Sequence, residues 1–316
     1  MLLKNPAAEK GTEGSPAQSV SCVKGVVMTE REYKICCDST CDLPEEYIKQ
    51  FKVEIFRLNF EIDGKSYKDG ELPFKDFYNR MRNGSSTKTA QIPPEVYRNE
   101  FEAAVKDGYD VLYLGFSSGL SGSFNSSCIA RDDVLEKYPD AKIICVDSLC
   151  ASTGEGLLLY KACEKKAEGL GIDELARWLE KNKLHLCHMF TVDDLKYLHR
   201  GGRVSKATAV AGTLLGIKPV LHVDNEGRLV PLGKVRGRKQ SLNKLVEMME
   251  ERIDGWDNPV IAICQGDCIE DAEYVAELAR KKLGKKTKVI ISYTGTVIGS
   301  HSGPGTLALF FMGEKR

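Results

Sequence analysis

Serine hydroxyls gather in the stretch LYLGFSSGLSGSFNSS, residues 112–127, and two kinds of chemistry fit them. Gly115, Ser117 and Gly119 form the pattern G-x-S-x-G, which places the nucleophile of serine hydrolases on a sharp turn between a strand and a helix. The same stretch also indicates a helix start, where free backbone N–H groups and hydroxyls can bind an anion. Either one serine attacks a substrate, or several hydroxyls hold a ligand still.

The hydrolase interpretation requires a base beside the serine and a third group that orients the base. Ser117, then Asp147 or Asp224, then His301 follow the Ser–Asp–His order of α/β-hydrolases. No HGGG-type segment precedes Ser117, and G-x-S-x-G arises often by chance in turns rich in glycine and serine. A serine esterase that uses Ser117 and His301 is therefore the second hypothesis.

The anion-holding interpretation uses the serines that follow the expected strand 109–116. Ser118 and Ser121 lie where the next helix should begin, and Gly122 lets a ligand approach the backbone. A neutral site of hydroxyls and amides suits one carboxylate or phosphate. The structural alternative is a capped helix whose hydroxyls are already satisfied.

Other polar loops are expected at the same edge, because ligands of open parallel sheets bind at the carboxyl ends of the strands. His301 lies in GSHSGPG, whose glycines favour close approach of a ligand. It is the one obvious acid–base group among these loops. The loops rich in hydroxyl, glycine or amide groups are 38–42, 87–91, 116–123, 146–153 and 299–305.

Strands and helices alternate from residue 33 to residue 185, which predicts a parallel sheet with helices on both faces. Asp63-Gly64 indicates a hairpin within 53–70, and STKTAQIPP (86–94) is expected to be a loop. The expected strands are 33–40, 109–116 and 141–148. The expected helices are 42–51, 74–84, 94–108, 121–139, 151–169 and 171–185.

A second α/β domain with a mixed sheet is expected after this region. It contains helices 235–253 and 268–284, a strand at 258–267, and a strand within 288–303 that ends in a glycine-rich loop. Residues 207–217 predict a helix of small apolar residues, suited to an apolar tunnel or to a core or dimer contact. The expected domains are a flexible leader at 1–30, with Met28 as a candidate start after an expression tag, then 31–190 and 191–316.

Composition excludes several classes of function. Lys+Arg and Asp+Glu are balanced at 45 each, so no net field favours nucleic acid or an anionic membrane. No apolar run reaches the roughly 18 residues of a spanning helix, so we expect no stable membrane insertion. The odd cysteine count of 11 without a secretion signal indicates free thiols in a reducing cytoplasm. Without zinc-ligand spacing, G-x-G-x-x-G or a P-loop, we expect no metal or nucleotide cofactor.

The ordered motifs of the chain resemble those of the DegV family over residues 33–316. The motifs are CDSTCDLP, TAQIPP, SSGLSGSFNSS, VDS, YLHRGGRVS, GIKPVL, GKVRGRKQSL and HSGPGTLALFF. The resemblance implies two α/β domains with a long-chain fatty acid, such as palmitate or oleate, bound between them. It further implies a bacterial, cytoplasmic, non-catalytic subunit that presents the fatty acid carboxylate to an ATP-binding kinase subunit. The product, acyl phosphate, would enter phospholipid synthesis, and we expect a monomer.

The resemblance also assigns site residues. Thr89 and Ser121 fall on the carboxylate-binding threonine and serine of the family, with Ser117, Ser118 and Gly122 close by. His301 and Arg203 fall on a polar pair near the carboxylate, and the arginine is expected to face the kinase partner or its phosphate. The seven expected site residues are Thr89, Ser117, Ser118, Ser121, Gly122, Arg203 and His301.

Two positions depart from the family pattern. Ala90 replaces the usual serine after Thr89, and Ser123 replaces the usual threonine after Gly122. Ser123 keeps its hydroxyl, whereas Ala90 removes one hydrogen bond from the expected site. A third hypothesis, a regulatory protein that senses lipid without supporting acyl phosphate formation, is also compatible with these residues.

Overall fold

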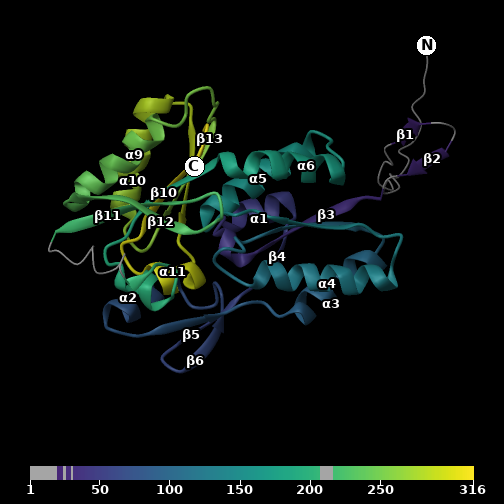
Figure 1. Cartoon of the computed structure of the whole chain (residues 1–316), viewed down its shortest axis with the longest axis horizontal. Coiled ribbons are helices and arrows are strands. Elements are labelled where there is room, and N and C mark those ends of the chain that lie inside the picture. The colour runs from purple at the N-terminus through teal and green to yellow at the C-terminus, as the bar shows by residue number, and fades with distance from the viewer. Residues whose placement is uncertain (1–19, 24–25, 30, 207–215) are drawn as a thin grey trace, which may run out of the picture. The chain divides into compact units, whose positions relative to one another are not determined.

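The computed structural model describes residues 20–23, 26–29, 31–206 and 216–316 (Figure 1). Contacts divide the chain into two units, residues 1–32 and 33–316. The first unit contains an antiparallel hairpin of β1 (Val20–Val23) and β2 (Val26–Thr29) within the expected leader. The fold below is that of the second unit, which holds the three other sheets as one compact body.

The expected parallel sheet is present, with strand order β4-β3-β8-β9. Its strands are β3 (Tyr33–Asp38), β4 (Glu54–Phe56), β8 (Asp110–Gly115) and β9 (Ile143–Asp147). Every residue of β8 is buried, as expected for a central strand covered on both sides.

Alternation along the strands sends side chains to two separate cores. Leu112 and Leu114 of β8 pack with α5 (Thr153–Ala167) and α6 (Ile172–Asn182). Val111 and Tyr113 pack on the other side with α3 (Pro94–Lys106) and α4 (Ser123–Lys137). Helices therefore cover both faces of the sheet, which confirms this part of the fold prediction.

A small antiparallel sheet of order β6-β5-β7 follows the parallel one. The predicted hairpin at Asp63-Gly64 joins β5 (Asn59–Ile62) to β6 (Lys65–Lys68), and both turn residues have positive φ. The predicted loop over 86–94 is wrong in part, because Thr87–Ala90 form β7 and pair with β5. A short, largely exposed strand carries no apolar alternation that would reveal it.

The six-stranded sheet has the order β12-β11-β10-β15-β13-β14. Only β13 and β14 pair in parallel among its neighbours, so the sheet is mixed, as predicted. The central strand β15 was missing from the sequence prediction, although its six residues are all buried. The strands are β10 (Leu186–Thr191), β11 (Ile217–Val223), β12 (Leu229–Arg236), β13 (Val260–Gln265), β14 (Lys288–Tyr293) and β15 (Leu307–Met312).

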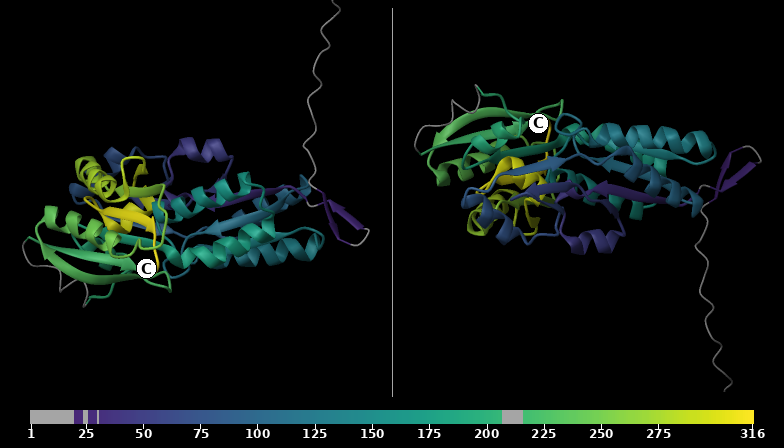
Figure 2. Two further views of the ribbon diagram at one scale, coloured as in Figure 1. Left: turned by 90° about the horizontal axis from the view of Figure 1, so that it is seen from above. Right: turned by 90° about the horizontal axis from the view of Figure 1, so that it is seen from below.

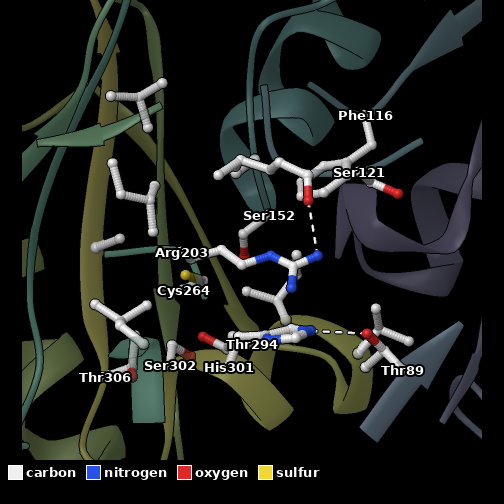
Figure 3. Close-up of a pocket in the computed structure, with 18 of the residues that line it drawn as sticks. Thr89, Phe116, Ser121, Ser152, Arg203, Cys264, Thr294, His301, Ser302 and Thr306 are labelled. Carbon is white, nitrogen blue, oxygen red and sulfur yellow. Dashed lines mark hydrogen bonds between the residues drawn. The ribbon is translucent and has the colours of Figure 1, made fainter. Parts of the chain in front are cut away.

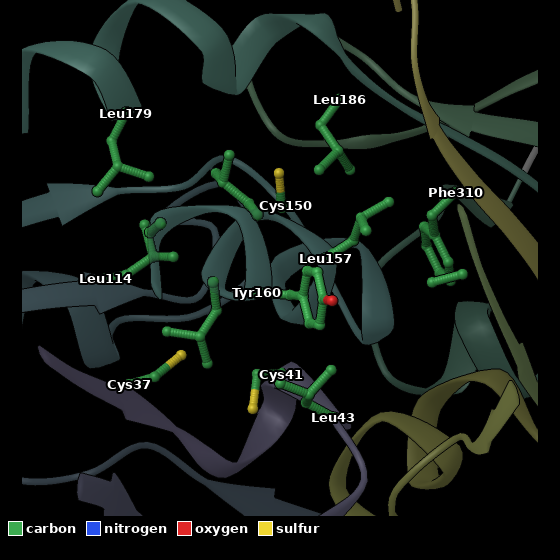
Figure 4. Close-up of a cluster of buried hydrophobic side chains, with 14 of the residues drawn as sticks. Cys37, Cys41, Leu43, Leu114, Cys150, Leu157, Tyr160, Leu179, Leu186 and Phe310 are labelled. Carbon is green, nitrogen blue, oxygen red and sulfur yellow. The ribbon is translucent and has the colours of Figure 1, made fainter. Parts of the chain in front are cut away.

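Helices also pack on both faces of the six-stranded sheet. On one face α9 (Arg238–Glu250) and α10 (Ile269–Leu283) form an apolar cluster with β10, β13 and β15. On the other face α5 joins the two large sheets, because Leu114 of β8, Leu157 of α5 and Phe310 of β15 belong to one buried cluster (Figure 4). Figure 2 shows the green and yellow elements of the six-stranded sheet gathered on one side of the blue and teal elements.

The segment 288–303 differs from its prediction. Its strand ends at Tyr293, and the expected glycine-rich loop is largely the helix α11 (Thr296–Ser302). Asp69 caps this helix by accepting hydrogen bonds from the Thr296 N–H at 3.0 Å and from its hydroxyl at 2.6 Å. Because this cap comes from residue 69, the local sequence does not reveal the helix.

The remaining described helices are short or lie at the periphery. They are η1 (Ser39–Cys41), α1 (Glu45–Phe51), α2 (Phe74–Arg82), η2 (Lys183–His185) and α7 (Lys196–Arg200). The predicted helix 207–217 lies almost wholly outside the described residues. No helix in the described ranges is long and apolar enough to cross a membrane. The ten cysteines from Cys36 to Cys268 are free thiols, as predicted.

Two buried acids lie beneath the carboxyl edge of the parallel sheet. Asp38 accepts hydrogen bonds from the Tyr113 hydroxyl at 2.9 Å and from the Phe116 N–H at 3.0 Å. Glu155 accepts from the Cys37 thiol at 3.2 Å and from the Thr40 hydroxyl at 3.3 Å. Glu155 is fully buried, and burial raises its pKa well above the ordinary 4.5.

This burial predicts a pH dependence that Glu155→Gln removes. The folded state holds the Glu155 proton more tightly than the unfolded chain, so the free energy of unfolding falls as pH rises above about 4.5. We expect the variant to gain stability relative to the parent protein as pH increases, measured by urea denaturation at pH 5 and pH 8. Parallel pH profiles of the two proteins would contradict this, and the exposed Glu136→Gln is the matched control.

Candidate functional site

One cavity of about 460 Å³ is lined by strands of the small and the six-stranded sheets, by the segments that follow β8 and β9 of the parallel sheet, and by α11 (Figure 3). Its size is in the range of small-molecule sites in proteins. Most of its wall is apolar. The apolar lining includes Leu58, Phe116, Phe190, Leu198, Val223, Leu229, Val297, Ile298, Ala308 and Phe310.

Four of the six predicted carboxylate-binding residues, Thr89, Ser121, Gly122 and His301, line this cavity. Thr89 of β7 and His301 of α11 are joined by a hydrogen bond of 2.7 Å between Oγ1 and Nε2. Ser121 and Gly122 line the same cavity just before α4 begins. The Ser121 hydroxyl accepts from the Ser123 N–H at 3.2 Å and donates to the Ser123 hydroxyl at 3.1 Å.

His301 is held in its neutral form. Burial, followed by the positive charges of Arg203 and Arg200, lowers its pKa to about 4. Its Nδ1 atom is buried without a hydrogen-bond partner, while Nε2 faces Thr89. In the tautomer whose Nε2–H donates to Thr89 Oγ1, the neutral imidazole leaves the Thr89 hydroxyl hydrogen free to donate to one anionic oxygen.

Arg203 places a positive charge in the cavity wall. Its guanidinium donates to the carbonyls of Leu120, at 2.8 Å, and of Gly201. Within the described part of the chain it forms no salt bridge, although partial burial lowers its pKa below the ordinary value. A half-buried arginine that lines the cavity and lacks a carboxylate partner favours an anionic ligand.

Ser117 and Ser118 do not line the cavity. Ser117 is fully buried and donates to the Gly227 carbonyl at 2.8 Å, which ties the loop after β8 to the turn between β11 and β12. Ser118 is exposed, and its N–H donates to Asp147 Oδ1 at 3.2 Å. The hydrogen bonds of a Ser117–His301 pair are not formed.

The two departures from the family pattern have different consequences. Ala90 lines the cavity and leaves it one hydroxyl short at that position. The buried Ser123 accepts a hydrogen bond from the Ile92 N–H at 3.2 Å. Ser123 thereby fastens the segment after Thr89 to the start of α4, and its hydroxyl is already occupied.

The far wall of the cavity is the inner face of the six-stranded sheet, which the sequence prediction did not identify. The strand register places Phe190 of β10, Ala308 of β15 and Cys264 of β13 side by side across the sheet. His188 of β10 and Phe310 of β15 are paired in the next row on the same face. A lining role cannot be read from these strands, because inward apolar residues look alike whether they face a core or a cavity.

His188 is a structural histidine in this wall. Its Nε2 accepts from the Ala151 N–H at 3.1 Å, and Nδ1 pairs with the Leu186 carbonyl at 3.1 Å. Burial lowers its pKa well below the ordinary 6.5. Both ring nitrogens are satisfied by the backbone, so His188 has no atom left for a ligand. In the described ranges, no cluster of three or more His, Cys, Asp or Glu is arranged to hold a metal ion.

A sequence model described as "Uncharacterised protein, DegV family" matches residues 32–314. The chain belongs to the DegV family. A DegV domain-containing protein of Clostridium perfringens is 46% identical over 289 residues, which are 90% of this chain and 99% of the relative. Another, from Lactococcus lactis, is 35% identical over 90% of this chain and 98% of the relative.

Solved DegV structures share the fold over almost their whole length. A stearic acid-binding protein of Eubacterium ventriosum has a TM-score of 0.79 at 30% identity, covering 89% of this chain and 98% of that chain. The fatty acid binding DegV of Bacillus subtilis has a TM-score of 0.77 at 30% identity, covering 90% and 100%. These similar DegV proteins bind fatty acids.

Proposed function

We propose that this DegV protein binds a long-chain fatty acid, with its carboxylate at Thr89, Ser121 and His301 and its tail in the apolar part of the cavity. The observation that carries the proposal is Arg203, which forms no ion pair with any described residue and lines a largely apolar cavity beside the hydroxyl groups. The fatty acids bound by the similar DegV proteins support the same ligand class.

The polar end suits a carboxylate for electrostatic reasons. A buried carboxylate without partners would be strongly disfavoured, and charge-assisted hydrogen bonds offset that cost. Thr89, Ser121 and the neutral His301 supply donors, and the backbone N–H of Gly122 lies on the same wall. Arg203 adds the positive charge that a neutral hydroxyl site would lack.

The apolar wall suits an acyl chain. Each buried methylene contributes about 0.8 kcal/mol, so a long tail can be held tightly without covalent attachment. Ser117 donates to the Gly227 carbonyl rather than to a base, and no described residue pairs with His301 Nδ1 to orient the imidazole beside Thr89. We therefore propose a carrier in the cytoplasm, monomeric and without catalysis of its own, rather than an esterase.

The proposed partner is an ATP-dependent kinase subunit that phosphorylates the presented carboxylate and supplies acyl phosphate for phospholipid synthesis. Delipidated protein, palmitate, ATP and a bacterial fatty acid kinase subunit should yield acyl phosphate, trapped as hydroxamate. Lipid binding without any acyl phosphate would favour the lipid-sensing alternative. Labelling of Ser117 by a fluorophosphonate, lost in Ser117→Ala together with ester turnover, would revive the esterase.

Gly201→Ala tests the position of His301. A Cβ atom at Gly201 would overlap His301 Nδ1, whereas the backbone there is helical, with φ −74°, and tolerates alanine. We expect His301 to be displaced from Thr89 and palmitate affinity to fall by about tenfold. Titration of delipidated protein measures this. Gly233→Ala, where the added Cβ meets nothing within 4 Å, is the control. Equal affinity of the two variants would contradict the assigned role of His301.

A further inference from the structure

Two hydroxyls in the cavity wall, those of Thr294 and Ser302, have no hydrogen-bond partner among the residues that the structure describes. Thr294 is fully buried and Ser302 is 5% exposed. Thr294 lies two residues before α11, and Ser302 is the last residue of this helix, which also carries His301 (Figure 3). Buried polar groups in native proteins are almost always paired, and an unpaired one at a ligand cavity points to a polar group on the ligand.

The neighbouring hydroxyls show that partners are available locally. Ser300 donates to the Thr296 carbonyl at 2.7 Å, one helical turn back. Thr306 also lines the cavity, and it donates to the Gly303 carbonyl at 2.8 Å. Among the hydroxyls of this segment, the lack of a partner in the described residues is therefore specific to Thr294 and Ser302.

The surroundings of the two hydroxyls are polar for an acyl-chain tunnel. Cys264 of β13 and Ser152 line the same cavity. The Ser152 hydroxyl donates to the Asp42 carboxylate and is thereby occupied. The Cys264 thiol lies close to the Thr294 hydroxyl, and a thiol is at most a weak hydrogen-bond partner.

Two of the three proposed carboxylate donors, Thr89 and Ser121, come from other elements than Thr294 and Ser302, whereas the third, His301, lies on α11 beside Ser302. Thr89 belongs to β7 of the small sheet, and Ser121 precedes α4. Ser302 lies beside Thr306 at the start of β15, on the side of the six-stranded sheet in Figure 3, whereas Thr89 and Ser121 are on the opposite side of that view. A ligand held by its carboxylate would meet Thr294 and Ser302 with another part of its structure.

Building on the proposed fatty acid site, we propose that the preferred ligand is an oxygenated fatty acid, whose chain carries a hydroxyl or keto group that pairs with one of the two unpaired hydroxyls, that of Thr294 or that of Ser302. A hydrocarbon tail would cover both hydroxyls without satisfying either. A chain oxygen can accept a hydrogen bond from either hydroxyl.

The test is displacement of a fluorescent fatty acid from delipidated full-length protein by palmitate and by positional isomers of hydroxypalmitate. At least one isomer should bind about fivefold more tightly than palmitate, as one good hydrogen bond would provide. Thr294→Val together with Ser302→Ala should abolish the preference, and Thr294→Ser, which keeps a hydroxyl, should retain it.

Thr191→Val is the matched control, because the Thr191 hydroxyl is also buried and unpartnered but does not line the cavity. The preference of Thr191→Val for hydroxypalmitate over palmitate should equal that of the parent protein. Equal binding of palmitate and every isomer, or a preference that survives the double substitution, would overturn this inference while leaving fatty acid binding intact. Failure of all these acids to bind would overturn the proposed function as well.

Discussion

Thr89→Val combined with Ser121→Ala is expected to lower the affinity for palmitate by about a hundredfold, because hydrogen bonds to a charged group contribute about 1.5–3 kcal/mol each. Thr89 Oγ1 lies 2.7 Å from His301 Nε2, and Ser121 lines the same cavity. The double variant removes both hydroxyl donors while leaving the apolar wall intact. Titration of the delipidated proteins with palmitate measures the loss.

Hexadecanol separates the carboxylate contribution from that of the tail. It presents the same chain without a negative charge, so its affinity should fall much less in the double variant. Ser118→Ala, outside the cavity and exposed, should leave palmitate binding unchanged. An equal loss for hexadecanol and palmitate would show that the substitutions perturb packing rather than carboxylate binding.

Arg316→Ala is expected to lower the free energy of unfolding by about 3 kcal/mol or more, since several buried carbonyls would lose a charged donor at once. The side chain is 8% exposed and forms no salt bridge in the described ranges. Its guanidinium instead donates to carbonyls of several separate segments. The accepting carbonyl oxygens are those of Ser148, Leu149, Lys183, Leu186 and Asp224.

The position of Arg316 connects stability to the cavity. The loop at Ser148–Leu149 leads into Ala151 and Ser152, which line the cavity. Urea denaturation of Arg316→Ala measures the loss, and Arg228→Ala, an exposed arginine paired with Glu226, is the control. A difference between the two variants below about 0.5 kcal/mol would contradict the structural role of Arg316.

The elements that could be predicted are those with strong local signals. The buried run of β8 and the Asp63-Gly64 hairpin are examples, because chain direction and burial there follow from the residues themselves. The strand β7 and the helix α11 were wrongly predicted as loops. Each depends on partners far along the chain: β7 pairs with β5, and Asp69 caps α11.

The site residues could be predicted from local motifs, but their hydrogen-bond partners could not. Thr89 and His301 are 212 positions apart. Their loops, 87–91 and 299–305, are both expected at one edge of the sheet, and the resemblance to the DegV family assigned the two residues to the carboxylate site. G-x-S-x-G drew attention to Ser117, whose partner, the Gly227 carbonyl, lies 110 positions away. The pairing of Thr306 and the lack of a partner at Thr294 and Ser302 are likewise properties of the folded chain.

The central proposal, fatty acid binding, is tested most directly by the lipid that accompanies the protein. Protein purified gently, without detergent or organic solvent, is denatured, and the released small molecules are identified by mass spectrometry. A fatty acid in near-stoichiometric amount is the expected result. No released fatty acid, together with no binding of added palmitate or oleate to the intact protein, would contradict the proposal.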